Sequence, residues 1–409
     1  MGSRPIFRPA STRLVISLAT VLLATGAWAA STTKVIHSFG GGSDGAYLDT
    51  ELVRDSAGNL YGTSVQGGTG SGTVFQVTPA GVHTVLYSFT GGADGGEPYK
   101  GVTLDAAGNL YGTTVTGGGG ACEGGCGVIF KLTNNGGTWT QSIVYAFQGG
   151  NDGYEPGSPV AFDSRGNLYG TTPLGGKYNL GVVYRISPNG TGGWNFRVIH
   201  TFTGGVDGGG GSAGKILIDS AGHLFGVCTV GGVNGFGTVY AMALVQGKWI
   251  FKTLYAFNDQ PDGALPYGSV VADKFGNLYG TTYYAGANDW GTVYKLTRSN
   301  GAWTETVLYS FQGGTDGAQP ISSLVSDGAG HFYGTTSAGG SSTCGCGVIF
   351  EMFRNSAGQW SEKVRYRFPG APNAGQAYNG MVSDAAGNFY GATVHGGSTN
   401  DGAIYQFTP

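Results

Sequence analysis

Residues 105–112 read Asp-Ala-Ala-Gly-Asn-Leu-Tyr-Gly, and variants of this phrase recur along the chain after residue 50. The general form is Asp-x-x-Gly-Asn/His-Leu/Phe-aromatic-Gly. The seven copies begin at Asp55, Asp105, Asp163, Asp219, Asp273, Asp327 and Asp384. The period is therefore 50 to 58 residues. A period in this range, with several strand-like runs per unit, is typical of a repeat array or a closed propeller.

The second repeat shows what each unit contains. Residues 102–105, 110–114, 127–132 and 143–147 are short runs rich in β-branched and aromatic residues, bounded by Gly, Asn and Asp. Such runs predict β-strands, and no segment after residue 30 has helical periodicity. Four strands in each of seven units predict an all-β fold, a seven-bladed β-propeller with four antiparallel strands per blade.

The aspartate of each phrase has a local explanation. A carboxylate can accept hydrogen bonds from the backbone of the turn that it opens, and glycine fills the left-handed position of such a turn without steric cost. We therefore interpret the seven aspartates as structural turn residues. A metal-binding or catalytic role is the less favoured alternative.

Each second strand also contains a glycine, which costs about 0.5–1 kcal/mol relative to alanine inside a strand. These glycines are Gly62, Gly112, Gly170, Gly226, Gly280, Gly334 and Gly391. Glycine within a strand often marks a close approach of another group. We expect an aromatic ring from the third or fourth strand to cover each one.

The two ends of the repeat region are out of phase. Residues 35–39 resemble a fourth strand with no earlier strands of its own, and the last unit ends with a third strand at residues 402–405. We predict that the N-terminal strand completes the last blade, because this removes an open edge.

Residues 1–29 predict a secretory signal peptide. Arg4, Arg8 and Arg13 precede an apolar run at residues 14–26 and a small-x-small cleavage site at residues 27–29. The run is short for a membrane span of about 20 residues. Residues 30–409 are then a single propeller domain, exported to the periplasm, the cell surface or the medium, with no membrane span, and expected to be a monomer.

The charge of the chain limits its partners. Loss of the three arginines and no acid would lower the net charge from −3 to −6. The remaining chain has no basic cluster, which argues against nucleic acid as a partner.

The repeated phrase, with Ser/Ala/Thr-Phe-x-Gly-Gly-x-Asp-Gly before it and Gly-Thr-Val-Phe/Tyr-x-Leu after it, resembles the Gloeo-Verruco extracellular tandem-repeat family. The resemblance covers about residues 33–409. It implies an extracellular or cell-surface β-propeller whose biochemical activity is not established. More loosely, the phrase is similar to blades of sensor-kinase and lactonase-type propellers.

Six loops that lead from a fourth strand into the next blade carry Asp-Gly. Their aspartates are Asp44, Asp94, Asp152, Asp207, Asp262 and Asp316. Because strand direction alternates, these loops share a face with the loops between second and third strands. The carboxylates are candidate ligands for a polyol or for calcium, the one cofactor considered. The favoured alternative is that each aspartate caps its own loop, because no loop has the Asp-x-Asp-x-Asp spacing of a calcium cage. No dedicated metal site is expected.

Four cysteines lie in two equivalent loops, Cys122 with Cys126 and Cys344 with Cys346. A shared zinc site is a poor alternative because the second and sixth units lie nearly opposite each other in a seven-fold ring. Export favours two local disulfides. Cys228 is left over and is expected to be a buried free thiol.

No nucleophilic or acid–base constellation is visible. Glu97 and Glu155 occupy matching loop positions and are weak candidates for a carboxylate pair. The favoured alternative for both is a solvated loop charge. Phosphate-loop, Rossmann and metalloprotease motifs are absent.

The sequence thus predicts an exported, non-catalytic propeller that displays loops for binding a glycan or a protein. The alternative is an enzyme of lactonase or polysaccharide-lyase type that acts at the mouth of the channel. Convergence of several of Glu97, Glu155, Lys100 and Lys215 in one pocket would favour the enzyme.

Overall fold

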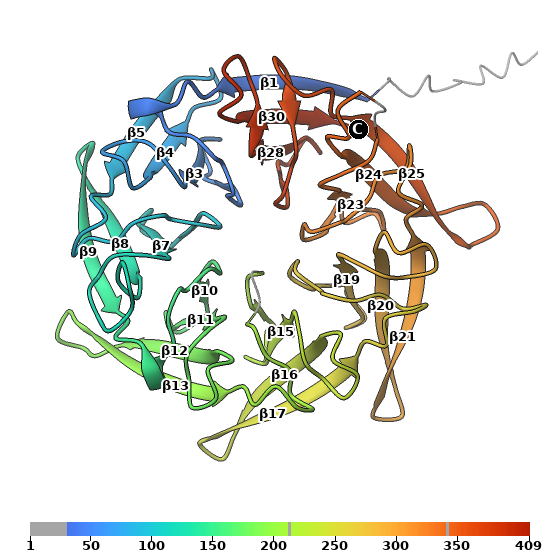
Figure 1. The fold of residues 1–409 in the computed structure, drawn as a ribbon, viewed down its shortest axis with the longest axis horizontal. Helices are drawn as coiled ribbons and strands as arrows, with labels where there is room; N and C mark the ends of the chain where they lie inside the picture. The colour runs from blue at the N-terminus through green and yellow to red at the C-terminus, as the bar shows by residue number, and fades with distance from the viewer. Residues whose placement is uncertain (1–30, 212–213, 341–342) are drawn as a thin grey trace, which may run out of the picture. The chain divides into compact units, whose positions relative to one another are not determined.

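Seven four-stranded antiparallel sheets are arranged around a common axis (Figure 1). This computed structural model describes residues 31–211, 214–340 and 343–409. The predicted signal peptide, residues 1–29, lies outside the described residues. Residues 31–409 form one compact unit. The prediction of a seven-bladed β-propeller with four antiparallel strands per blade is confirmed.

The strands follow each other from the axis to the rim within each blade. Blade 1 contains β2 (Val53–Arg54), β3 (Leu60–Ser64), β4 (Thr73–Val77) and β5 (His83–Ser88). Blade 2 contains β6 (Val102–Leu104), β7 (Leu110–Thr114), β8 (Val128–Asn135) and β9 (Thr138–Ala146). Blade 3 contains β10 (Ala161–Phe162), β11 (Leu168–Thr172), β12 (Val182–Pro188) and β13 (Trp194–Thr201). Blade 4 contains β14 (Leu217–Ile218), β15 (Leu224–Cys228), β16 (Thr238–Val245) and β17 (Lys248–Ala256).

The remaining blades have the same plan. Blade 5 contains β18 (Val271–Ala272), β19 (Leu278–Thr282), β20 (Thr292–Ser299) and β21 (Ala302–Ser310). Blade 6 contains β22 (Val325–Ser326), β23 (Phe332–Thr335), β24 (Val348–Arg354) and β25 (Trp360–Arg367). Blade 7 contains β27 (Val382–Ser383), β28 (Phe389–Thr393), β30 (Ala403–Thr408) and β1 (Thr32–Ser38).

The N-terminal strand completes the last blade, as predicted. Strand β1 pairs antiparallel with β30, from Thr32 opposite Thr408 to Ser38 opposite Ala403. Figure 1 shows the blue β1 lying along the outer side of the red β30. The ring is therefore closed by strand pairing between its first and last repeats.

Rings of the third strand cover the glycines of the second strand. Gly280, for example, lies opposite Tyr294 in the β19–β20 pair, and a methyl group on Gly280 would be 2.6 Å from Cζ of Tyr294. The covering rings are Phe75, Phe130, Tyr184, Tyr240, Tyr294, Phe350 and Tyr405. The expected compensation for the glycines is thus confirmed, with the third strand as its source.

The same rings join neighbouring blades. The phenylalanine that follows each fourth strand is fully buried and packs against the third-strand ring of the next blade; the centroids of Phe39 and Phe75 are 4.9 Å apart, and those of Phe147 and Tyr184 are 5.5 Å apart. One such pair occurs at every junction between blades. Edge-to-face and tilted contacts of this kind stabilise the rings beyond the area that they bury.

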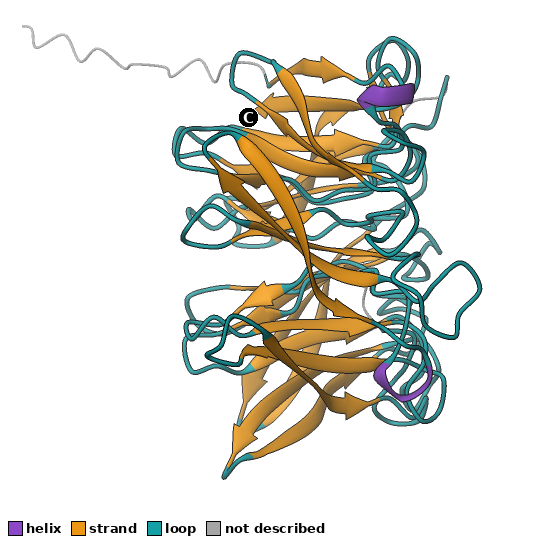
Figure 2. Cartoon of the chain, turned by 90° about the vertical axis from the view of Figure 1, so that its left-hand side faces the viewer, coloured by secondary structure: helices purple, strands orange, loops and turns teal. Residues whose placement is uncertain are grey.

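The two kinds of long loop share one face, as expected from the alternation of strand direction. Bridges such as Ala46 with Gln66 connect the loop that enters a blade with the loop between its second and third strands. In blade 7 the equivalent bridge is the pair β26 (Ala374–Gly375) and β29 (His395–Gly396). Figure 2 shows the longer loops gathered on one side of the sheets, with the 3-10 turns η1 (Gly42–Asp44) and η2 (Gly150–Asp152). We call this side the loop face. Among the described residues, no helix is long and apolar enough to cross a membrane.

Candidate functional site

The aspartate of each repeated phrase is bonded within its own turn. Asp55 accepts hydrogen bonds from the backbone and side-chain amides of Asn59, both at 2.8 Å, and from the hydroxyl of Tyr61 at 2.9 Å. Burial alone would raise the pKa of Asp55, but these hydrogen bonds hold it below its usual value. The turn contacts recur in the other six copies, with histidine replacing asparagine at His223 and His331. The seven aspartates lie in separate turns and do not form a shared site.

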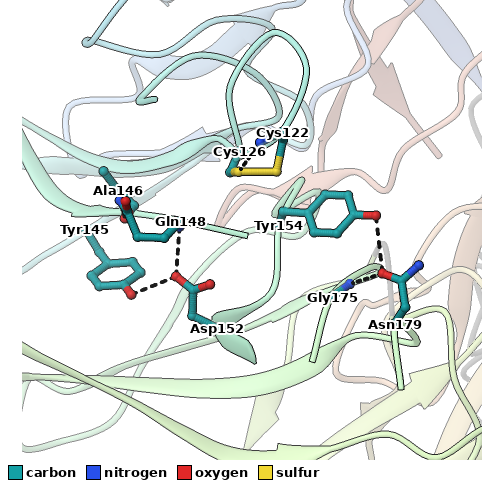
Figure 3. Close-up of a disulfide and its surroundings, with 9 residues drawn as sticks. All are labelled: Cys122, Cys126, Tyr145, Ala146, Gln148, Asp152, Tyr154, Gly175 and Asn179. Carbon is teal, nitrogen blue, oxygen red and sulfur yellow. Dashed lines mark hydrogen bonds between the residues drawn. A yellow bond between two sulfur atoms is a disulfide. The ribbon is translucent and has the colours of Figure 1, made fainter. Parts of the chain in front are cut away.

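The six loop aspartates are also engaged locally. Oδ2 of Asp152 accepts hydrogen bonds from the hydroxyl of Tyr145 and from the backbone amide of Gln148, each at 2.9 Å (Figure 3). The same two contacts recur at Asp94, Asp207, Asp262 and Asp316. One comes from a tyrosine or histidine of the fourth strand, and the other comes from the backbone amide of the residue four positions before the aspartate. Asp44 accepts a hydrogen bond from the amide of Gly40 and lies beside His37. Each carboxylate thus stabilises its own loop, and the structure does not bring the six together.

The cysteines pair within their own loops. Cys122 is disulfide-bonded to Cys126 (Figure 3), and Cys344 is disulfide-bonded to Cys346. Both pairs lie between the second and third strands, on the loop face. Cys228 is a buried free thiol at the end of β15, and burial raises its pKa.

No contact among the described residues joins Glu97 to Glu155, and the cavity that Glu97 lines does not include Glu155. Both have a left-handed backbone, with φ of 54° and 55°. The same repeat position is also left-handed in Tyr47, Leu265, Gln319 and Gln376. The two glutamates therefore occupy a position that shapes the loop in every repeat, which gives the pair no special geometry.

Polar side chains of a different kind meet at the axis of the ring. The first group comes from the loops that enter blades 1, 2 and 7 and consists of Asp49, Lys100 and Asn379. Nζ of Lys100 lies 2.5 Å from Oδ1 of Asp49 and 3.3 Å from Oδ1 of Asn379, and Nδ2 of Asn379 donates to Oδ1 of Asp49 at 2.7 Å. This network links three blades.

A second pair of charged groups lies further into the channel. Oγ of Ser323 donates to Oε1 of Glu51 at 3.1 Å, and Nζ of Lys215 donates to Oγ1 of Thr103 at 3.1 Å. Burial raises the pKa of Glu51, an effect that the nearby Lys215 only partly offsets. Burial also lowers the pKa of Lys215, with Glu51 acting in the opposite sense. The two groups therefore interact, but no direct ion pair joins them among the contacts of the described residues.

Two adjoining cavities surround these groups. The channel cavity, of about 470 Å³, is lined in every blade by the first strand or by the residues just before it, and includes Glu51 and Lys215. The mouth cavity, of about 130 Å³, is lined by Lys100, Tyr267, Tyr378 and Asn379. Glu51 and Ser323 line both cavities and so form the boundary between them.

Two tyrosine side chains, Tyr267 and Tyr378, line the mouth cavity. The rings of Tyr267 and Tyr283 meet edge to face with centroids 5.5 Å apart. Burial raises the pKa of Tyr378, and the neighbouring Tyr283 and Asp49 add to the effect. The mouth thus combines aromatic rings with the Asp49–Lys100–Asn379 network.

The comparison with known proteins identifies the repeat. A family model described as the Gloeobacter/Verrucomicrobia repeat matches residues 23–158, 119–345 and 212–409. The chain belongs to this repeat family. No curated protein matches its sequence.

Several solved structures resemble this member of the repeat family. The extracellular domain of a candidate one-component system from B. thetaiotaomicron has a TM-score of 0.53 at 9% identity, over 90% of this chain and 39% of that chain. A protein from Lactobacillus plantarum has a TM-score of 0.51 at 13% identity, over 86% of this chain and 99% of that chain. A candidate 6-phosphogluconolactonase from Bacteroides uniformis has a TM-score of 0.49 at 15% identity, over 76% of this chain and 83% of that chain. The first two similarities support the propeller fold alone, and the third carries no argument.

Sequence reasoning singled out Lys100 and Lys215 but missed Asp49, Glu51 and Asn379. One signal was available within the family repeat. The residues four positions before each repeated aspartate are Glu51, Gly101, Pro159, Lys215, Ser269, Ser323 and Gly380. A charged side chain in a column of otherwise small residues marks a position that the repeat itself does not require.

A second cluster that the sequence did not predict lies where blade 7 meets blade 1. His37, Asp44 and His83 each offer a ligand atom, and these atoms lie within 4.8 Å of one another. However, the two imidazole rings are stacked, with centroids 4.6 Å apart and planes at 11°. Nearly parallel rings cannot aim their in-plane lone pairs at one metal ion.

The equivalent contacts in other blades explain this cluster. Phe196 stacks on Tyr145 and Phe251 stacks on His200, with centroids 3.9 Å and 4.0 Å apart. We give the name seam position to the place on the fourth strand that His83, Phe196 and Phe251 occupy. His83 therefore follows the packing of the repeat, and burial lowers its pKa to about 4.

Proposed function

We propose that this chain is an exported propeller that binds a glycan at the mouth of its channel. The main support for this proposal is the Asp49–Lys100–Asn379 network, which joins three blades. Tyr267 and Tyr378 line the same cavity. Ligand sites typically combine aromatic walls with a few fixed polar groups, and this combination suits the faces and hydroxyl groups of a sugar. The loop aspartates are weaker candidates for the site, because each of them already accepts hydrogen bonds within its own loop.

Export has three supports. The predicted signal peptide precedes the propeller, the repeat resembles an extracellular family, and two local disulfides pin loops on the face that carries the mouth. Disulfides persist mainly in oxidising compartments. We place the protein in the periplasm, at the cell surface or in the medium.

A second candidate function is catalysis in the channel cavity. Glu51 and Lys215 face one cavity, and burial shifts their pKa values toward each other. Groups with perturbed pKa values in one pocket are typical of acid–base sites. In this alternative Glu51 would transfer the proton in a lactonase or lyase reaction.

A glycan array probed with residues 30–409 tests the binding proposal. Replacing Tyr378 with alanine should weaken binding of any glycan found by about tenfold or more, because a stacked ring and its buried area are lost. Tyr178, a 49% exposed tyrosine in blade 3, provides the matched control, and Tyr178→Ala should leave the affinity unchanged. An empty array, or equal losses in the two variants, would contradict the proposal.

The same reagents separate the two candidate functions. If the protein is an enzyme, a bound glycan or a lactone is converted over time, and Glu51→Gln abolishes the conversion while binding persists. If it is a binding protein, the ligand is recovered unchanged from both the original chain and the variant.

A further inference from the structure

Lys215 places a positive charge in the lining of the channel cavity. Among the described residues, its Nζ has one hydrogen-bond partner, Oγ1 of Thr103, and no carboxylate oxygen within 4.0 Å. An ammonium group has three N–H donors. Lys215 is half-buried, and a cation that is partly removed from water without a paired anion is costly, so an anion in the cavity would stabilise it.

Glu51 does not supply that partner. Its Oε1 is taken by Ser323, and it forms no ion pair with Lys215. Burial disfavours the charged form of both groups. The two side chains line the same cavity from different blades.

The rest of the channel cavity suits a sugar-sized molecule. Most of its lining is apolar, including Leu104, Ile216, Val270, Leu324 and Met381. Its volume of about 470 Å³ falls within the roughly 300–1,000 Å³ of small-molecule sites. The cavity adjoins the mouth cavity at Glu51 and Ser323, so one ligand could extend from the mouth into the channel.

We propose that the channel cavity binds the carboxylate group of an acidic sugar, a uronate, with Lys215 as its cation and Glu51 as a partner for a neighbouring hydroxyl group. This inference rests on the proposed function, because it names the class of glycan that enters the mouth. The lysine of the mouth network, Lys100, is already paired with Asp49. One unpaired cation balances a monoanion such as a carboxylate. Burial raises the pKa of Glu51 and so favours its neutral form; beside a neutral Glu51 a phosphate dianion would still leave excess negative charge, whereas a carboxylate would not.

Calorimetry with four probes tests the inference on the unaltered protein. Tri-galacturonate should bind at least about tenfold more tightly than its carboxyl-reduced form, galactotriose, because only the acid pairs with Lys215. Galactose 6-phosphate should show no advantage over galactose. This comparison needs no variant and therefore does not depend on how a substitution folds.

Lys215→Met supplies the second arm. Methionine keeps most of the aliphatic stem and removes the charge, so the preference for the acidic trisaccharide should disappear while the affinity for galactotriose is retained. Lys252→Met, at an exposed lysine on β17, is the control and should retain the preference. The melting temperature of each variant reports whether it is folded.

The possible outcomes separate the two proposals. Equal affinity for the acidic and reduced trisaccharides, a preference for the phosphate, or a preference that survives in Lys215→Met overturns the uronate inference. If neither trisaccharide binds but the array yields another glycan, the inference fails and the proposed function stands. If the array is also empty, both fail.

Discussion

At the scale of single residues, the propeller depends on glycines that leave room for a neighbouring aromatic ring. Gly280 has an ordinary strand backbone, and propensity alone would favour alanine there by about 0.5–1 kcal/mol. The buried ring of Tyr294 reverses this preference, because it occupies the space where a methyl group would lie. The phrase that builds each blade is thus maintained by packing between its second and third strands.

The variant Gly280→Ala tests this account. We expect it to lower the free energy of unfolding by about 1–3 kcal/mol, the usual range for overpacking in a tight core. Gly314, whose added methyl group would meet nothing within 4 Å, provides the control, and Gly314→Ala should change stability little. Urea denaturation of both variants measures the difference. A more stable Gly280→Ala would show that propensity outweighs the ring contact.

The sequence predicted the residues that repeat much better than those that do not. The turn aspartates and strand glycines recur every 50 to 58 residues and bond to near neighbours. The Asp49–Lys100–Asn379 network instead joins residues that are far apart in the sequence. Lys100 and Asn379 are 279 residues apart, and Asn379 and Asp49 are 330 residues apart. Such partners become apparent only when the blades are placed around the axis.

At the scale of elements, the fourth strands meet their neighbours through the seam position. Its residues in blades 1 to 6 are His83, Gln141, Phe196, Phe251, Glu305 and Glu362. The residue type at the seam position thus varies from blade to blade, although the aromatic pairs at the junctions repeat. At Glu305, burial and the charge of Asp262 raise the pKa to about 8, and its Oε1 is buried with no hydrogen-bond partner among the described residues.

This glutamate should make the junction of blades 4 and 5 sensitive to pH. A folded-state pKa of about 8 against an ordinary value of 4.5 means that the folded protein holds an extra proton between these values. Stability therefore falls as the pH rises through this window. Glu305→Gln places at this seam the residue type of blade 2, where Gln141 donates to the backbone carbonyl of Asp94.

We expect Glu305→Gln to melt at about the same temperature as the unaltered protein at pH 4.5 and at a higher temperature at pH 8. Glu123→Gln, at an exposed loop glutamate, should follow the unaltered protein at both values. Thermal melts across the pH range measure the effect. Parallel curves for Glu305→Gln and the unaltered protein would mean that the carboxyl group titrates normally.

At the scale of the whole molecule, stability is distributed around a closed circle. Every junction between blades has its own aromatic pair, and at the junction of blades 7 and 1 this pair is Phe39 with Phe75. Strand β1 contributes both to this junction and to the ladder with β30. Its removal would leave the edge of β30 open and one aromatic pair unmade.

Deletion of residues 31–40 should therefore destabilise all seven blades together. We expect a single melting transition at a lower temperature, measured by circular dichroism. A synthetic peptide of residues 31–40 should restore the temperature as its concentration rises, by adding the missing strand. Fraying of a small part of the signal, with the main transition unmoved, would contradict cooperative closure.

The pairing of β1 with β30 also constrains the order of assembly. Thr32 and Thr408 are partners across nearly the full length of the chain, and contacts between such distant residues carry the greatest loop-closure entropy. The blades can form from local hairpins, whereas the last seam must wait until the final repeat has left the ribosome. During that interval β1 and β30 both present unpaired edges, so the kinetic bottleneck of folding and the main opportunity for misassembly coincide in blade 7.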